Sequence, residues 1–218
     1  MRTFGKWILV FGLLVTCVSF ARSADPANPE KIIPREGAVQ LILLCQHSVQ
    51  DDLKLTKDQI QKIEAFADSQ WKKMHEIHKL EPEKAHPKFE DLGKENVKFI
   101  SETLKPEQHK RLDQISMHVA GLLWALDPKV AQALNLTDAQ KQKIKELHKA
   151  AHKEVEAAFD MPDKAARHTK FEELRKAHRK ELMMVLTDEQ KTKWKEMAGE
   201  PFKGKLEIAD HGPAKGKP

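Results

Sequence analysis

The stretch Leu186–Gln190 reads LTDEQ, and it decides the fold because close copies of it recur along the chain. The first copy and the second start 49 residues apart, the third and fourth 50 apart, and the first and third 81 apart. This spacing predicts a duplicated unit of about 80 residues, covering 37–117 and 118–200, with two copies in each unit. The other copies are Leu55–Gln59 (LTKDQ), Leu104–Gln108 (LKPEQ) and Leu136–Gln140 (LTDAQ).

Apolar residues outside the motif keep the same register between the two units. The match is spread along the whole unit, which favours duplication over chance. The matched pairs are Val49 with Val130, Leu53 with Leu134, Ile63 with Ile144, Phe89 with Phe171, and Leu112 with Trp194.

Thr-x-x-Gln is the pattern of a capping box at the start of a helix. The threonine oxygen accepts from the backbone N–H three residues on, and the glutamine side chain accepts from the threonine's own N–H. In the second copy Lys105 cannot accept a hydrogen bond, but Pro106 suits the first helical position. The motif therefore has a structural explanation and contains no strong nucleophile. The residues assigned to this role are Leu55, Thr56, Gln59, Leu104, Gln108, Leu136, Thr137, Gln140, Leu186, Thr187 and Gln190.

After each motif, apolar residues recur at steps of three and four, as on one face of an amphipathic helix. Between the two helices of each unit lie LEPEKAHP (80–87) and FDMPDKA (159–165), where proline predicts a turn. Glycine is scarce, and no stretch alternates as a strand would. We therefore predict an all-α fold of long antiparallel helices.

Residues 1–24 have the features of a secretory signal peptide. Arg2 and Lys6 precede an apolar run, and Ala21-Arg22-Ser23 puts small residues at the cleavage positions. The apolar run is shorter than the roughly 20 residues that a membrane span requires. We therefore expect a protein exported to the periplasm or secreted, without membrane insertion after the signal is removed.

The charge of the remaining chain is nearly balanced. The sequence has 38 Lys and Arg against 33 Asp and Glu, and the signal holds three of the basic residues and none of the acidic ones. A dense mixture of both signs favours solubility and gives no indication of a nucleic-acid partner. We expect a linker over 25–36 and a disordered basic tail over 201–218.

Cys45 is the single cysteine left after signal removal. No internal disulfide can then form, even in an oxidising compartment. Its apolar surroundings in LILLC favour burial, with an intermolecular bridge as the alternative.

Repeated Leu-Thr-x-x-Gln in an exported, helical chain rich in Lys and Glu resembles the LTXXQ-motif proteins of the Spy/CpxP family. The resemblance covers most of residues 49–198. It implies a periplasmic stress protein: Spy-like members are ATP-independent chaperones whose curved helices dimerise into a cradle, and CpxP-like members attenuate an envelope-stress sensor kinase. Members typically carry two motifs and this chain carries four, which implies two tandem Spy-like units that form an extended or cradle-shaped pseudo-dimer.

A chaperone of this type needs exposed apolar side chains that hold unfolded or partly folded client proteins without locking them in place. Methionine suits such a surface because its side chain is soft and adaptable, and aromatic residues offer large apolar area. The alternative for each is the hydrophobic core. The candidates are Trp71, Met74, Met117, Trp124, Phe159, Met183, Met184, Trp194 and Met197.

Two histidine pairs have helical spacing that suits a metal. His148 and His152 are four residues apart, and His75 and His78 are three apart, so each pair can place two imidazoles on one zinc ion. No third ligand is evident in the sequence. The histidine pairs make zinc binding an alternative function, and the family resemblance adds regulation of a membrane sensor kinase.

The sequence gives no indication of an enzyme. It has no glycine-rich phosphate loop, no Gly-x-Ser-x-Gly and no haem-attachment motif. We predict a non-catalytic envelope protein that acts as a chaperone and uses no cofactor. A third hypothesis is a purely structural protein of the envelope.

Overall fold

The computed structural model describes residues 37–121, 124–159 and 161–206, and every regular element in these ranges is a helix. The predicted all-α class is therefore confirmed. The predicted signal peptide (1–24) and the predicted linker (25–36) lie outside the described residues. No described helix combines the length and the hydropathy that crossing a bilayer requires.

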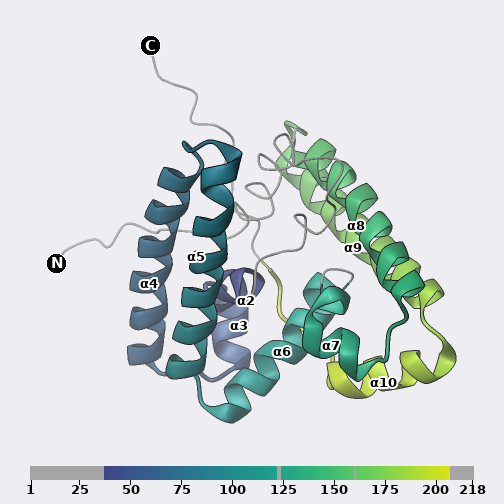
Figure 1. The fold of residues 1–218 in the computed structure, drawn as a ribbon. Helices are drawn as coiled ribbons and strands as arrows, with labels where there is room; N and C mark the ends of the chain where they lie inside the picture. Colours follow the sequence, from purple (N-terminus) through teal and green to yellow (C-terminus); the bar gives the residue numbers. More distant parts are fainter. Residues whose placement is uncertain (1–36, 122–123, 160, 207–218) are drawn as a thin grey trace.

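Two long helical hairpins dominate the structure, each followed by a shorter helix (Figure 1). Helix α4 packs along α5, and α8 packs along α9. Each unit has two short helices, then two long ones, then a closing helix, although the first short helix is an α-helix in one unit and a 3-10 helix in the other, and α6 extends to Ala120, past the predicted boundary at 117. The first unit contains α2 (Ala38–Leu44), α3 (His47–Asp52), α4 (Lys57–Ile77), α5 (Pro82–Thr103) and α6 (Pro106–Ala120). The second contains the 3-10 helix η2 (Trp124–Leu126), then α7 (Pro128–Ala133), α8 (Asp138–Phe159), α9 (Lys164–Val185) and α10 (Asp188–Ala198).

The turn before each hairpin has the same geometry in both units. Lys54 and Asn135, 81 residues apart, adopt left-handed backbone conformations with φ of 50° and 52°. In both turns the N–H of the next leucine donates to a carbonyl five residues earlier, from Leu55 to Gln50 and from Leu136 to Ala131, each at 3.0 Å. This is the Schellman pattern that ends a helix. The same turn therefore precedes the first long helix of the hairpin in both units.

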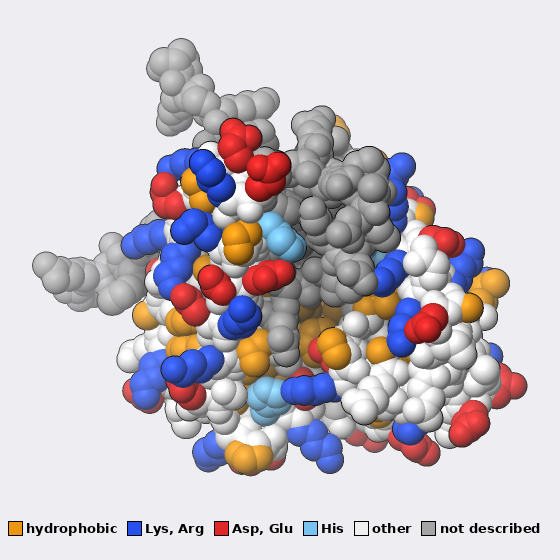
Figure 2. Space-filling view, in the orientation of Figure 1, with side chains coloured by type: hydrophobic (Ala, Val, Ile, Leu, Met, Phe, Trp, Pro, Cys, Tyr) orange, Lys and Arg blue, Asp and Glu red, His pale blue; other side chains and the backbone are white. Residues whose placement is uncertain are grey.

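Each unit has its own hydrophobic core near the base of its hairpin. Equivalent positions are buried in both units, including Ile63 with Ile144 and Leu112 with Trp194. A smaller cluster lies further along the α4–α5 hairpin, where Phe89 is buried. Side chains of both charges are interspersed over the visible face, and hydrophobic ones reach the surface between the two units (Figure 2).

One proline departs from the expected turn. Helix α5 begins at Pro82, as a proline at the first helical position should, but it continues through Pro87. The prediction that both prolines of LEPEKAHP lie in a turn is therefore wrong for Pro87. Pro87 removes the hydrogen bond to the Glu83 carbonyl and its ring crowds that carbonyl; Glu83 is an exposed residue in the first turn, where water can reach the freed carbonyl.

The chain after α10 returns to the first unit. Residues 201–206, part of the expected basic tail, lie against that unit, and Phe202 and Leu206 pack on its core. The Arg111 guanidinium, held by Asp52, donates to the Glu200 carbonyl at 2.7 Å. We call residues 200–206 the C-terminal strap, because they tie the second unit to the first. The rest of the expected tail, 207–218, lies outside the described residues.

Candidate functional site

The motif glutamines cap their own helices, as the sequence predicts. Gln59 Oε1 accepts from the Thr56 N–H at 3.0 Å, and Thr56 Oγ1 accepts from the Gln59 N–H at 3.2 Å. The boxes at Thr137 and Thr187 repeat this geometry. At Lys105 only half of the box forms, where the backbone N–H donates to Gln108 Oε1 at 3.0 Å, because a lysine side chain has no acceptor.

The same glutamines also join helices to one another, a role that the sequence reasoning missed. Gln59 Nε2 donates to Gln108 Oε1 and to the Thr103 carbonyl, both at 2.8 Å. Gln108 Nε2 donates to the Leu53 carbonyl at 3.1 Å and to Gln59 Oε1 at 3.3 Å. Both glutamines are buried. Each amide therefore has all its hydrogens paired, as a buried polar group requires.

The second unit repeats this pairing. Gln140 Nε2 donates to Gln190 Oε1 at 2.7 Å and to the Val185 carbonyl at 3.0 Å. Gln190 Nε2 donates back to Gln140 Oε1 at 3.0 Å and to the Leu134 carbonyl at 3.2 Å. We call each set a glutamine junction. It satisfies the starts of two helices and the ends of two others, so these motif residues have a structural role.

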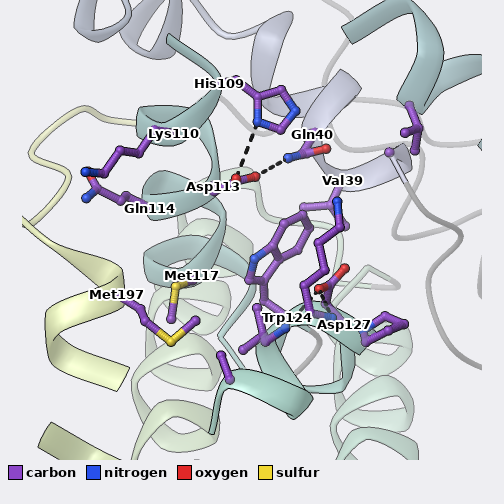
Figure 3. Close-up of a pocket in the computed structure, with 16 residues that line it drawn as sticks. Val39, Gln40, His109, Lys110, Asp113, Gln114, Met117, Trp124, Asp127 and Met197 are labelled. Carbon is purple, nitrogen blue, oxygen red and sulfur yellow. Dashed lines mark hydrogen bonds and ion pairs between the residues drawn. The ribbon is translucent and has the colours of Figure 1, made fainter. Parts of the chain in front are cut away.

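A pocket of about 590 Å³ lies where the two units meet. Helices α2, α5 and α6 of the first unit line it, together with η2, α7 and α10 of the second (Figure 3). We call it the inter-unit pocket. Its size falls within the range of pockets that bind small ligands, roughly 300–1,000 Å³.

Three of the predicted client-binding residues meet in this pocket. Met117 comes from α6, Trp124 from η2 and Met197 from α10. The Trp124 indole stands in the middle, with the two methionine side chains to one side (Figure 3). Val97 and Val130 add to the apolar wall. The structure thus brings together side chains that lie far apart in the sequence.

A polar group of three side chains forms another wall. Asp113 accepts from Gln40 Nε2 at 2.6 Å and lies 3.4 Å from His109 Nδ1. Burial raises the pKa of the Asp113 carboxyl; His109 and Lys129 oppose that rise and Asp127 adds to it. This wall offers one carboxylate, one imidazole and an amide to a ligand.

Asp127 also has a structural role at the pocket. Its carboxylate accepts from the Lys129 and Val130 backbone N–H groups at 2.9 and 3.1 Å, which caps α7. The sequence reasoning did not find Gln40, His109 or Asp113. They belong to no repeated motif, and nothing in the sequence shows that α2 and α6 lie side by side.

The other client-binding candidates are dispersed. Met74 and Trp194 are buried in the cores, so their assignment to an exposed client-binding surface is wrong. Met117 is also largely buried, but it lines the inter-unit pocket. Trp71 and Met183 are half-buried against those cores. Met184 stays exposed, at 76%. The side chain of Phe159 lies outside the described residues.

The histidine pairs lie in different surroundings. His78 packs edge-on against Phe89, with ring centroids 5.1 Å apart, whereas the ring centroid of the exposed His75 lies 6.2 Å from that of Trp71. His148 is largely buried, and the side chain of His152 lies outside the described residues. Within the described part of the chain, no three His, Cys, Asp or Glu side chains come together as a metal site. Zinc binding stays a prediction.

Comparison with known proteins adds no further assignment. No family model, no curated protein and no solved structure matches this chain.

Proposed function

We propose that this protein is an ATP-independent chaperone of the cell envelope, which holds apolar segments of partly folded clients in the inter-unit pocket. The observation that supports the proposal is the meeting of Met117, Trp124 and Met197 in one pocket. The flexible methionine thioethers adapt to side chains of many shapes, as a binder of diverse clients requires, and the Trp124 indole adds a large apolar surface.

The size of the pocket suits a weak grip on a client. A volume of about 590 Å³ accommodates a few side chains and no folded domain. A client held at so few points keeps most of its chain free, so it can fold after release. The polar wall of Gln40, His109 and Asp113 can accept hydrogen bonds from a client backbone or donate to it.

We also infer that the two units of one chain do the work of the two subunits in a Spy-like dimer. The repeated hairpins, the repeated Schellman turns and the two glutamine junctions support this arrangement. A monomer in multi-angle light scattering is the expected result. A stable homodimer would contradict the inference.

The test is the light scattering of an unfolding client, with the chain from Asp25 added at increasing ratios and no ATP present. We expect suppression at near-stoichiometric amounts. Ala133 lines the pocket at the end of α7, so Ala133→Trp fills part of the pocket and should weaken suppression.

The matched control is Ala139→Trp, which places the same side chain at an exposed position of α8 away from the pocket. It should suppress aggregation as the unchanged chain does. If the unchanged chain is folded by circular dichroism and suppresses nothing, the proposed function is wrong. If both tryptophan variants lose activity equally, the pocket is not the client site.

A further inference from the structure

Helices α5 and α9 occupy equivalent places in the two units, but their charges differ. Their sequences align at an offset of 82 residues, which pairs Phe89 with Phe171 and Leu104 with Leu186. Helix α5 has four lysines against five carboxylates, whereas α9 has seven Lys and Arg against three Glu. The duplicated unit therefore supplies an internal comparison for α9.

Much of the difference comes from lost carboxylates. Three lysines of α5 align with lysines of α9, but three glutamates of α5 align with uncharged residues of α9. The retained pairs are Lys88 with Lys170, Lys94 with Lys176, and Lys98 with Lys180. The changed pairs are Glu83 with Ala165, Glu95 with Ala177, and Glu102 with Met184.

The ion pairs of the two helices differ accordingly. On α5, Lys94 lies 3.4 Å from Asp91, and Lys98 lies 3.9 Å from Glu102. On α9, Lys176 and Lys180 are exposed, and neither forms an ion pair with any side chain that the structure describes. They are four residues apart on one face, where like charges destabilise a helix slightly. The stability of the fold therefore does not explain this face.

We infer that the exposed face of α9 binds the surface of an anionic lipid bilayer. The face carries Lys170, Lys176 and Lys180, with Glu173 as the one exposed carboxylate among them, and Met184 lies at its end. Each lysine near an anionic leaflet gains attraction without needing a shaped partner. The helix packs against α8 and leaves this face outward.

The same face lacks what a protein partner uses. Protein interfaces draw most of their affinity from buried tryptophan, tyrosine and arginine anchors in complementary pockets. The exposed residues between 166 and 184 include three lysines, one arginine and one glutamate, Glu173; the others are alanine, threonine and histidine, and Met184 is the single large apolar one. A planar, fluid, negatively charged surface fits this composition better than a folded protein does.

The test is co-sedimentation of the chain from Asp25 with lipid vesicles at low salt. We expect binding to vesicles of one part phosphatidylglycerol to three parts phosphatidylcholine, no binding to pure phosphatidylcholine, and release as salt screens the charges. The double variant Ala177→Glu, Met184→Glu restores the residues of α5 at these positions, so the fold should accept it. Its two added negative charges should weaken binding by about tenfold or more.

The matched control is Lys94→Ala with Lys98→Ala on α5, which lowers the net charge by the same amount. It should bind anionic vesicles nearly as the unchanged chain does. Equal losses in both variants would show an effect of net charge alone and would overturn the inference. So would binding to soluble polyglutamate without binding to vesicles. The inference stands apart from the chaperone proposal, because the inter-unit pocket contains none of these residues.

Discussion

Gln59 and Gln108, which are 49 residues apart in the sequence, donate hydrogen bonds to each other's side-chain oxygens where α4 and α6 begin. Each also accepts from the backbone N–H at the start of its own helix. A glutamate could accept from the backbone N–H, but it could not donate to the other side chain, because a carboxylate has no N–H. The pairing therefore explains why all four copies of the motif end in glutamine.

Replacing Gln108 by glutamate should destabilise the first unit. The change removes both donors of Gln108 Nε2 and leaves the Leu53 carbonyl and Gln59 Oε1 each without that partner. A buried group that loses its partner costs about 1–3 kcal/mol, which urea unfolding should detect. Gln61→Glu, at an exposed position of α4, is the control and should change stability by less than about 0.5 kcal/mol. Equal effects would exclude the pairing as the cause.

Completing the broken capping box should stabilise the protein. Lys105→Thr supplies the oxygen that the N–H of Gln108 lacks, so the free energy of unfolding should rise by about 1 kcal/mol. The reverse change, Thr137→Ala, removes an acceptor that is present at 3.2 Å and should cost a similar amount. Melting curves that do not move for either variant would contradict the role of the threonine.

The left-handed turn at Lys54 predicts a further gain in stability. Lys54 adopts φ of 50°, a conformation that costs a residue with a side chain roughly 1 kcal/mol and glycine almost nothing. Lys54→Gly should therefore raise the free energy of unfolding by about 0.5–1 kcal/mol. Lys57→Gly, at the start of α4, is the contrast and should lower it. A fall in stability for Lys54→Gly would mean that its side chain contributes to the fold.

The sequence predicts the local part of this structure and misses the long-range part. The capping role of Gln59 follows from a pattern four residues long, but its contact with Gln108 depends on how the ends of separate helices meet. Apolar periodicity places Met74 and Met184 on helices without telling which of the two a neighbouring helix covers. The polar wall of the inter-unit pocket joins Gln40 and Asp113, 73 residues apart, and no repeat connects them.

Cys45 should react slowly in the folded protein. It packs against the first-unit core, and burial, followed by the charges of Glu64 and Asp68, raises its pKa from 9.0 to about 12. The thiolate is the reactive form, so iodoacetamide at pH 8 should label the native chain far more slowly than the chain in urea. Because the folded pKa is raised, the stabilising contribution is complete below pH 9 and falls as the pH rises toward 12. Equal labelling rates would show an accessible thiol, open to an intermolecular bridge.

The C-terminal strap should contribute to global stability. Ending the chain at Gly199 removes Phe202 and Leu206 from the first-unit core, and it removes the Glu200 carbonyl that Arg111 binds. Two half-buried side chains and one charged hydrogen bond are together worth about 2–4 kcal/mol. A chain that ends at Leu206 is the control, since it keeps the strap and loses only 207–218. We expect its melting temperature to match that of the full chain, with a clear drop when the chain ends at Gly199. Arg111, which donates to the Glu200 carbonyl of the strap, also donates to Gln114 Oε1 at 3.4 Å, and Gln114 lines the inter-unit pocket. Loss of the strap should therefore change the fluorescence of Trp124 in the pocket, measured with the other three tryptophans replaced by phenylalanine; an unchanged spectrum would separate the strap from the pocket.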